Sequence, residues 1–175
     1  MGEIRKHQPA KLIVGFIYQE TKALNEAIDL LEKRVGTIDF VSQELEFSHT
    51  TYYEKEFGKN LKRNFVTFHK LIPPENLTKI KLITNKIEKK FSHRGARSIN
   101  IDPGYLDLSK LILASTKDYM HRIYLGKGIY AEVTLFYQNK TFQAWEWTYP
   151  DYKTQEYINI FNSIRDRYAR QIKTA

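Results

Sequence analysis

The chain has 175 residues, a length that suits a single domain over residues 1–175, and its 42% hydrophobic and 14% aromatic content is enough to form a core. This composition argues against intrinsic disorder. Cysteine does not occur in the sequence, which excludes disulfides, thiolate metal sites and cysteine nucleophiles. The apolar run LIVGFIY is too short to cross a bilayer, and no signal-peptide cleavage site accompanies it. We therefore expect a soluble cytoplasmic protein without a membrane partner.

The net charge of +8 is concentrated in one segment. Residues 59–97 hold eleven Lys and Arg against two acids, Glu75 and Glu88, a local charge of +9 that leaves −1 for the rest of the chain. Such a segment attracts phosphates, RNA or acidic lipid heads. The simpler interpretation is a solvated helix face.

The first predicted elements are a strand and a helix. Residues 11–19 form a short apolar run that is typical of a buried central strand. Apolar residues then recur at helical spacing from Ala23 to Val35, and Gly36 follows where a helix C-cap favours positive φ. Residues 37–49 alternate but change phase midway, which predicts a bulge or a break.

A strand and a basic helix are predicted next. Residues 50–58 are typical of a helical turn that ends at Gly58, and residues 64–72 predict a strand. Pro73 and Pro74 stop that strand and start a helix. The apolar stripe of this helix is Leu77, Ile80, Ile83, Ile87 and Phe91. Its remaining face is assigned to Lys79, Lys81, Lys86, Lys89 and Lys90.

The fold class follows from the order of these elements. Residues 98–102 predict a strand, which Pro103 and Gly104 end as a turn pair. The order strand, helix, strand, strand, helix, strand predicts an α+β fold with a ferredoxin-like βαββαβ core over residues 1–102. Its helices would pack on one face of an antiparallel sheet.

Residues 103–175 extend this sheet and add a last helix. We expect a strand over residues 108–116, a hairpin around Gly126, Lys127 and Gly128, and a second turn at residues 138–140. The C-terminal helix has Thr154 as a plausible N-cap.

Two polar residues stand out on the strand of residues 98–102. Asn100 and Asp102 are two positions apart and therefore share a face, while Ile99 and Ile101 point toward the helices. Asn and Asp are depleted in strand interiors, which favours a ligand-binding role. The alternatives are an ordinary wet face and an Asx-type turn in which Asp102 caps the bend.

A polar connection between apolar strands supplies further candidates. Lys117 and Arg122, together with Lys127, offer donors suited to phosphate or carboxylate. His121 has an unperturbed pKa near neutrality and is a candidate acid, base or proton relay. The alternative is a structural turn in which Asp118 pairs with Arg122 or His121, and Asp118 otherwise joins the ligand-binding set.

Two more carboxylates lie in dense segments farther along the chain. Glu132 lies among apolar residues on a predicted strand, where a solvated outer face would explain it. If Asp102 and Glu132 instead face one cavity, they would hold Mg²⁺ or act as acid and base. Asp151 lies in WEWTYPDYK, which is either a docking loop for the last helix or an aromatic wall for a base or sugar.

Several familiar signatures do not occur in the sequence. It has no P-loop, no G-x-G-x-x-G after a strand, no H-E-x-x-H and no nucleophile elbow. Residues 116–118, TKD, only faintly echo the guanine-reading element of small GTPases. No reaction is therefore named by a motif.

Four segments in order, NIDPGYL, LASTKD, HRIYLGKGIYAEVTL and WTYPDY, resemble a prokaryotic family of unknown function, number 4416. The resemblance extends from KLIVGF to the last helix. Some members carry a GTP-binding label, which the residues here support little. The resemblance implies an uncharacterised stand-alone domain of about this length and brings no established catalytic residues.

Three functional interpretations follow. The first is a pocket, with or without enzymatic activity, for a small phosphorylated ligand or nucleotide, formed by residues 100–122 and Glu132. In it Asp102, His121 and Glu132 are the candidate catalysts. The second is an RNA-binding module that uses residues 59–97. The third is a structural or homodimeric protein that pairs through exposed sheet edges.

Overall fold

The computed structural model describes residues 2–48, 50, 52–93 and 95–174. Five residues lie outside these ranges: Met1, His49, Thr51, Arg94 and Ala175. They belong to predicted segments or to the count of Lys and Arg in residues 59–97. The strands are β1 Lys11–Tyr18, β2 Ile38–Val41, β3 Leu45–Phe47, β4 Leu61–Phe68, β5 Ser92–His93, β6 Ala96–Arg97, β7 Ile99–Leu106, β8 Lys110–Ser115, β9 Ile123–Gly126, β10 Ile129–Gln138 and β11 Thr141–Ala144. The helices are α1 Thr21–Val35, α2 Glu54–Phe57, α3 Leu77–Lys90 and α4 Gln155–Gln171, with 3₁₀ turns η1 Pro74–Asn76 and η2 Asp151–Lys153.

The fold is α+β, and the described residues form a nine-stranded antiparallel sheet as its centre. The strand order is β11-β10-β8-β7-β1-β4-β2, with β3 also paired to β4 and β9 to β10. The α+β class, the antiparallel sheet and its extension by C-terminal strands are confirmed. The β5–β6 pair forms a separate two-stranded ribbon.

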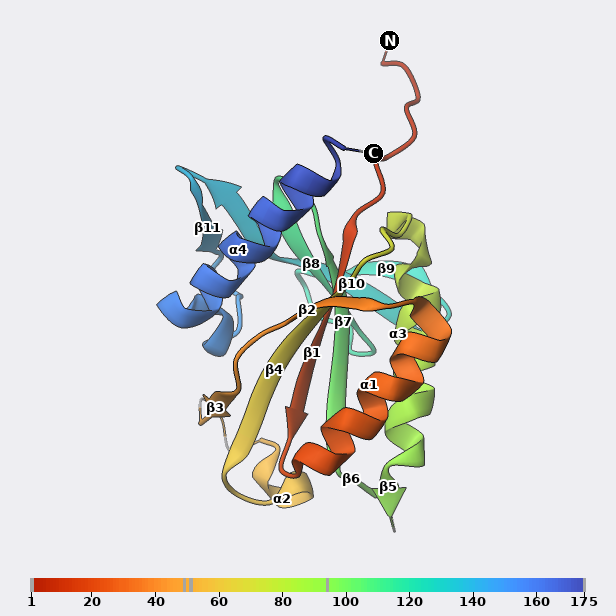
Figure 1. Cartoon of the computed structure of the whole chain (residues 1–175), viewed down its shortest axis with the longest axis vertical. Coiled ribbons are helices and arrows are strands. Elements are labelled where there is room, and N and C mark those ends of the chain that lie inside the picture. Colours follow the sequence, from red (N-terminus) through yellow and green to blue (C-terminus); the bar gives the residue numbers. More distant parts are fainter. Residues whose placement is uncertain (1, 49, 51, 94, 175) are drawn as a thin grey trace.

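Helices cover both faces of the sheet (Figure 1). Helices α1 and α3 pack on one face, where alternate residues of β1 such as Leu12, Val14 and Phe16 are fully buried. Helix α4 covers the opposite face, where Phe161 and Ile164 pack among buried residues of β4, β8 and β10. Strand β1 is thus buried on both sides, which explains why its sequence is apolar throughout.

Local signals explain where several elements begin and end. Helix α1 ends at Gly36, whose φ is +129° and whose N–H donates to the carbonyl of Glu32. Thr154 caps α4, because its side-chain oxygen accepts a hydrogen bond from the N–H of Tyr157. The phase change predicted in residues 37–49 is the break between β2 and β3. The hairpin turn before β10 and the turn before β11 are also as predicted.

Two predictions were wrong, and a third had the right element with different bounds. Pro103 and Gly104 do not end a strand, because β7 continues through them to Leu106 and pairs there with β1. The strand predicted over residues 64–72 is β4, which begins at Leu61 and ends at Phe68. Lys81 does not lie on the exposed face of α3: only 5% of it is accessible, because it faces the sheet.

The boundary proposed after residue 102 falls inside β7, while the single-domain prediction stays a prediction. In the described part of the chain, no helix is both long and apolar enough to span a membrane.

Candidate functional site

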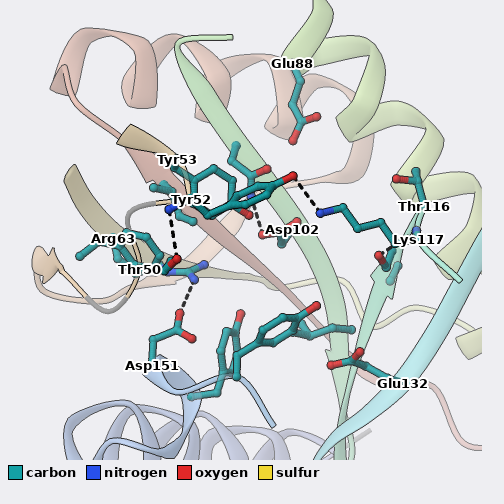
Figure 2. A pocket seen from close by; sticks show the side chains of 18 of the residues that line it. Thr50, Tyr52, Tyr53, Arg63, Glu88, Asp102, Thr116, Lys117, Glu132 and Asp151 are labelled. Carbon is teal, nitrogen blue, oxygen red and sulfur yellow. Dashed lines mark hydrogen bonds and ion pairs between the residues drawn. The ribbon is translucent and has the colours of Figure 1, made fainter. Parts of the chain in front are cut away.

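A cavity of about 710 Å³ opens between β7 and β8 (Figure 2). The two strands pair only from Gly104 opposite Leu113 to Leu106 opposite Leu111. On the N-terminal side of Pro103, from Ile99 to Asp102, β7 still pairs with β1. The C-terminal end of β8, Ala114 and Ser115, pairs with β10 instead of β7. Proline offers no N–H to a neighbouring strand, which fits its position where the β7–β8 ladder stops. The split in the sheet produces the cavity.

One wall of the cavity is a hydrogen-bonded chain of polar side chains from β6 and β7. Arg97 donates to the amide oxygen of Asn100 at 3.0 Å, and the amide nitrogen of Asn100 donates to Asp102 at 2.5 Å. The second carboxylate oxygen of Asp102 accepts from the Lys81 ammonium of α3 at 3.3 Å. The Asp102 side chain keeps 28% of its surface exposed. This carboxylate is therefore held in place and still reachable from the cavity.

Two glutamates fix Arg97 from behind. Glu56 of α2 accepts two bonds from the guanidinium, at 2.7 and 2.8 Å, and Glu88 of α3 accepts another at 3.3 Å. The bonds from Arg97 lower the pKa of Glu56. Burial raises the pKa of Glu88, although the nearby Lys81 ammonium opposes that effect. This wall therefore presents an immobilised cation, Arg97, beside the carboxylate of Asp102, which can accept hydrogen bonds.

The floor of the cavity is Arg63 of β4, whose side chain is only 4% exposed. Its guanidinium donates to Asp151 at 2.6 Å and lies within 6 Å of four aromatic rings, those of Phe47, Phe65, Tyr152 and Tyr157. A Cβ at Gly15 would lie 3.0 Å from the Arg63 Nη1 atom, so a glycine of β1 leaves room for this group. Besides Asp151, the hydroxyl of Tyr157 is a hydrogen-bond partner of this guanidinium. Figure 2 shows the guanidinium directed toward the middle of the cavity.

Glu132 lies on the opposite wall, and its carboxylate is closed off by its neighbours. Its Oε2 atom accepts from Arg122 at 2.7 Å and lies 3.2 Å from His121 Nε2. Its Oε1 atom accepts from Thr134 at 3.3 Å. Because the side chains of Glu132 and Arg122 are 1% and 2% exposed, this pair is a buried ion pair.

The loop between β8 and β9 carries Lys117 to the mouth of the cavity. Its ammonium donates to the hydroxyl of Tyr52 at 3.0 Å and lies 4.5 Å from the centre of that ring. This hydrogen bond lowers the pKa of Tyr52. Arg122 supports the loop from below, donating to the Ser115 hydroxyl and the Lys117 carbonyl at 3.0 and 2.9 Å. In Figure 2, Lys117 and Tyr52 reach toward each other across the cavity.

The comparison with known protein families matches residues 8–168 to Domain of unknown function (DUF4416). The chain belongs to this family. No curated protein and no solved structure matches the chain. The family predicted from the four sequence segments is thereby confirmed, and the site of this DUF4416 chain has to be interpreted from its own geometry.

The cavity brings together most of the side chains singled out in the sequence. Its lining includes Asn100, Asp102, Lys117, Glu132 and Asp151. His121 and Arg122 do not line it but bind Glu132 from behind. Their predicted roles in catalysis and anion binding stay predictions.

Two predicted ligand-binding residues lie away from the cavity lining of the DUF4416 chain. Asp118 is exposed in the β8–β9 loop, and Lys127 is exposed in the hairpin turn with a φ of +56°. The alternative pairing of Asp118 with Arg122 or His121 does not form, since both of those side chains bind Glu132. The Asx-type cap at Asp102 is also wrong, because no bend exists there.

The described residues contain no group of three or more His, Cys, Asp and Glu side chains able to hold a metal ion. Asp102 and Glu132, the pair predicted to bind Mg²⁺, both line the cavity. Each is already bound to a cationic side chain, Lys81 and Arg122 respectively.

Sequence reasoning missed the floor of the cavity and the residues that support its β7 wall. Arg63 fell outside the predicted strand, although it is two positions from Phe65 and so shares a face with it. Lys81 and Glu88 follow Leu77 at helical spacing, which places them on the buried face of α3. That spacing was the available signal. Arg97 and Glu56 are 41 positions apart in the sequence, so no local sequence pattern predicts that they are in contact.

Proposed function

We propose that the cavity binds a small phosphorylated ligand, such as a nucleotide or a sugar phosphate. Four cationic side chains and four carboxylates of the described chain line it, and they differ in how fully they are paired. Glu132 and Asp151 are closed by ion pairs to Arg122 and Arg63. Lys117 forms no ion pair with a described carboxylate and donates only to Tyr52. The cavity thus has more donors than its own acceptors use.

The observation that carries this proposal is the buried guanidinium of Arg63, which has more N–H donors than its neighbours accept from. A buried N–H without a partner costs about 1–3 kcal/mol, so native proteins rarely keep one without a reason. At the floor of the cavity, the five N–H groups of Arg63 outnumber the two side chains that accept from them, Asp151 and Tyr157. An anionic group that reaches this floor would accept a hydrogen bond from one of the remaining N–H groups, and a guanidinium suits phosphate.

The rim of the cavity favours a ligand with a planar part. Tyr52, Tyr119 and Tyr149 line it and are 61%, 55% and 41% exposed. Exposed aromatic rings beside a charged interior suit a base or sugar ring attached to a phosphate. The volume of about 710 Å³ also lies within the range of about 300–1,000 Å³ that is usual for such ligands.

Binding, rather than a reaction, is the part of the proposal with structural support. Asp102 is the one candidate catalyst whose carboxylate is both placed by two neighbours and partly exposed, at 28%. It could accept a hydrogen bond from a ligand hydroxyl or remove its proton. Glu132 has no such freedom while Arg122 covers it.

A thermal-shift screen tests the proposal. The panel contains nucleoside monophosphates, ribose 5-phosphate and inorganic phosphate. A ligand at a hundredfold its Kd adds about 2.7 kcal/mol of stability, which raises Tm by several degrees. We expect the largest shift from an organic phosphate, and a smaller one for Arg63→Lys, which keeps the charge opposite Asp151 but loses the Nε and Nη1 donors. A flat response of the folded wild-type protein to the whole panel would refute the proposal.

We also propose that the core has the ferredoxin-like topology predicted from the sequence. The strand order β7-β1-β4-β2, with antiparallel neighbours, supports it. So does the packing of α1 and α3, the two crossover helices, on the same face.

RNA binding through α3 is a second candidate function. Lys79, Lys86, Lys89 and Lys90 are exposed on this helix, and none forms an ion pair with a described carboxylate. An unpaired basic helix can follow a phosphate backbone. Binding of RNA that weakens at high salt and is lost when Lys86, Lys89 and Lys90 are all changed to Gln would support it. Unchanged binding in that triple variant would exclude it.

A further inference from the structure

Exposed apolar side chains gather along one edge of the sheet. We use the name β9 surface for Met120, Ile123, Tyr124, Leu125, Trp145 and Trp147. Met120 is fully exposed, and Ile123 and Tyr124 are 72% and 58% exposed. Most other large apolar side chains of the described chain are buried in its clusters. This concentration at one edge requires an explanation.

The edge is built from β9, Trp147 and β11. Strand β10 pairs with β8 along one side, whereas its other side pairs with β9 at Ile129–Ala131 and with β11 at Leu135–Gln138. The indole of Trp147 donates to the Val133 carbonyl in the interval between these two strands, at 3.1 Å. Trp145 stacks on Trp147 with ring centres 5.1 Å apart. The apolar side chains therefore lie along the same side of β10, on and before β9 and in the segment that follows β11.

Both faces of β9 are exposed, and its outer edge pairs with no strand of the described chain. Natural sheets usually protect such an edge with charged side chains. The residues of β9, Ile123 to Gly126, include no charge. The neighbouring Arg122 is neutralised by Glu132 and is buried. The strand itself therefore carries no unpaired charge that would prevent association, although it is short and its register with β10 is irregular.

We propose that the β9 surface is the interface of a homodimer, in which a second copy presents the same surface across a two-fold axis. An isologous contact needs a self-complementary surface, and a predominantly aromatic and aliphatic border, interrupted by the charge of Glu146, meets that need. An acidic partner would instead bind the basic face of α3, because the chain has a net charge of +8.

The size of the surface fits this occupant. Aromatic side chains bury roughly 150–250 Å² each when fully covered, so the three partly exposed aromatic members and their three aliphatic neighbours present several hundred Å². A standard interface takes about 800 Å² from each partner. Because the pairing of β9 with β10 is irregular, we expect few N–H and C=O groups on the outer edge of β9 to be aligned for pairing with another strand. Side-chain packing would therefore form most of the dimer contact.

Sedimentation velocity on the full chain tests this proposal. The wild type should sediment at twice the chain mass of 20.8 kDa at micromolar concentration. Ile123→Lys and Met120→Lys place a charge in the interface, and we expect each to weaken the dimer by about thirtyfold or more. Val41→Lys is the matched control, because Val41 is 52% exposed on β2, at the other end of the sheet.

The result that supports the proposal is a wild-type dimer that persists in Val41→Lys and dissociates in both lysine variants of the β9 surface. Met120 is fully exposed, so its variant should fold even if Ile123→Lys does not. A monomeric wild type would overturn the proposal. A dimer that survives both substitutions, or that only Val41→Lys disrupts, would overturn it as well.

Discussion

Arg122 and Glu132 form a buried ion pair, with Nε and Oε2 2.7 Å apart and side chains 2% and 1% exposed. The pair joins β10 to the loop that carries Lys117, since Arg122 also donates to the Lys117 carbonyl. Removing one member leaves a buried charge without its partner. The pair therefore connects the stability of the fold to the shape of the cavity mouth.

We expect Arg122→Ala and Glu132→Ala each to lower the free energy of unfolding by about 3–5 kcal/mol. The double variant should lose less than the sum, because no unpaired charge remains. Urea denaturation of all four proteins measures the coupling. Glu26→Ala is the control, because its pair with Lys22 is exposed and should contribute at most about 1 kcal/mol. Additive losses would contradict the pairing.

Gly104 lies in the segment where β7 pairs with β8. A Cβ at this position would overlap the carbonyl oxygen of Ile112, a backbone atom that cannot move aside easily. We expect Gly104→Ala to destabilise the protein by at least about 2 kcal/mol in urea denaturation. Gly2→Ala should have no effect, because nothing lies within 4 Å of its added Cβ. Equal stability of the two variants would rule out this close approach.

The Glu56–Arg97 pair gives a pH-dependent prediction. Hydrogen bonds from Arg97 lower the pKa of Glu56 from its ordinary value of 4.5. Because the pKa of Glu56 is lower in the folded protein than in the unfolded chain, the charged carboxylate stabilises the fold above pH 4.5. This contribution is lost as the pH falls from 4.5 through the lowered pKa of the folded state. Glu56→Gln should cost about 1 kcal/mol at neutral pH, and the difference from wild type should shrink in acid. A difference that stays constant from neutral pH into acid would refute the charge contribution.

The turn between β10 and β11 offers a stabilising change. Asn139 and Lys140 have φ values of +52° and +65°, the conformation of a two-residue hairpin turn that glycine prefers at its second position. Lys140→Gly should raise the free energy of unfolding by about 0.5–1 kcal/mol. A matched Lys173→Gly variant near the end of the chain, where φ is not positive, should not stabilise. Calorimetric Tm values of both variants provide the check.

Much of the secondary structure could be predicted because its signals are local. Gly36 ends α1, Thr154 caps α4, and the glycines around Lys127 form the hairpin as expected. Pro103 was misinterpreted because a proline-glycine pair usually marks a turn. Its strand tolerates proline only because β8 leaves β7 there, which is a tertiary arrangement that no local pattern reveals.

The candidate site was predictable only in part, for a similar reason. Asn100, Asp102 and Glu132 were found because polar residues stood out among apolar strand positions, and all three line the cavity. Asp118 lies in the same loop as Lys117, and sequence alone cannot tell which loop residues turn inward. Arg63 reaches the cavity across Gly15 of the neighbouring strand, so only the strand order brings it to the site.

The central claim is that the cavity binds a phosphorylated ligand, and the most direct test is its affinity in matched lysine variants. The best organic phosphate from the screen would be titrated by calorimetry into wild type, Lys117→Gln at the cavity mouth and Lys86→Gln on the exposed face of α3. Losing one charge-assisted hydrogen bond should weaken binding about tenfold to a hundredfold in Lys117→Gln and leave Lys86→Gln unchanged. Equal affinity of all three proteins, or a loss only in Lys86→Gln, would place the anion outside this cavity and contradict the account.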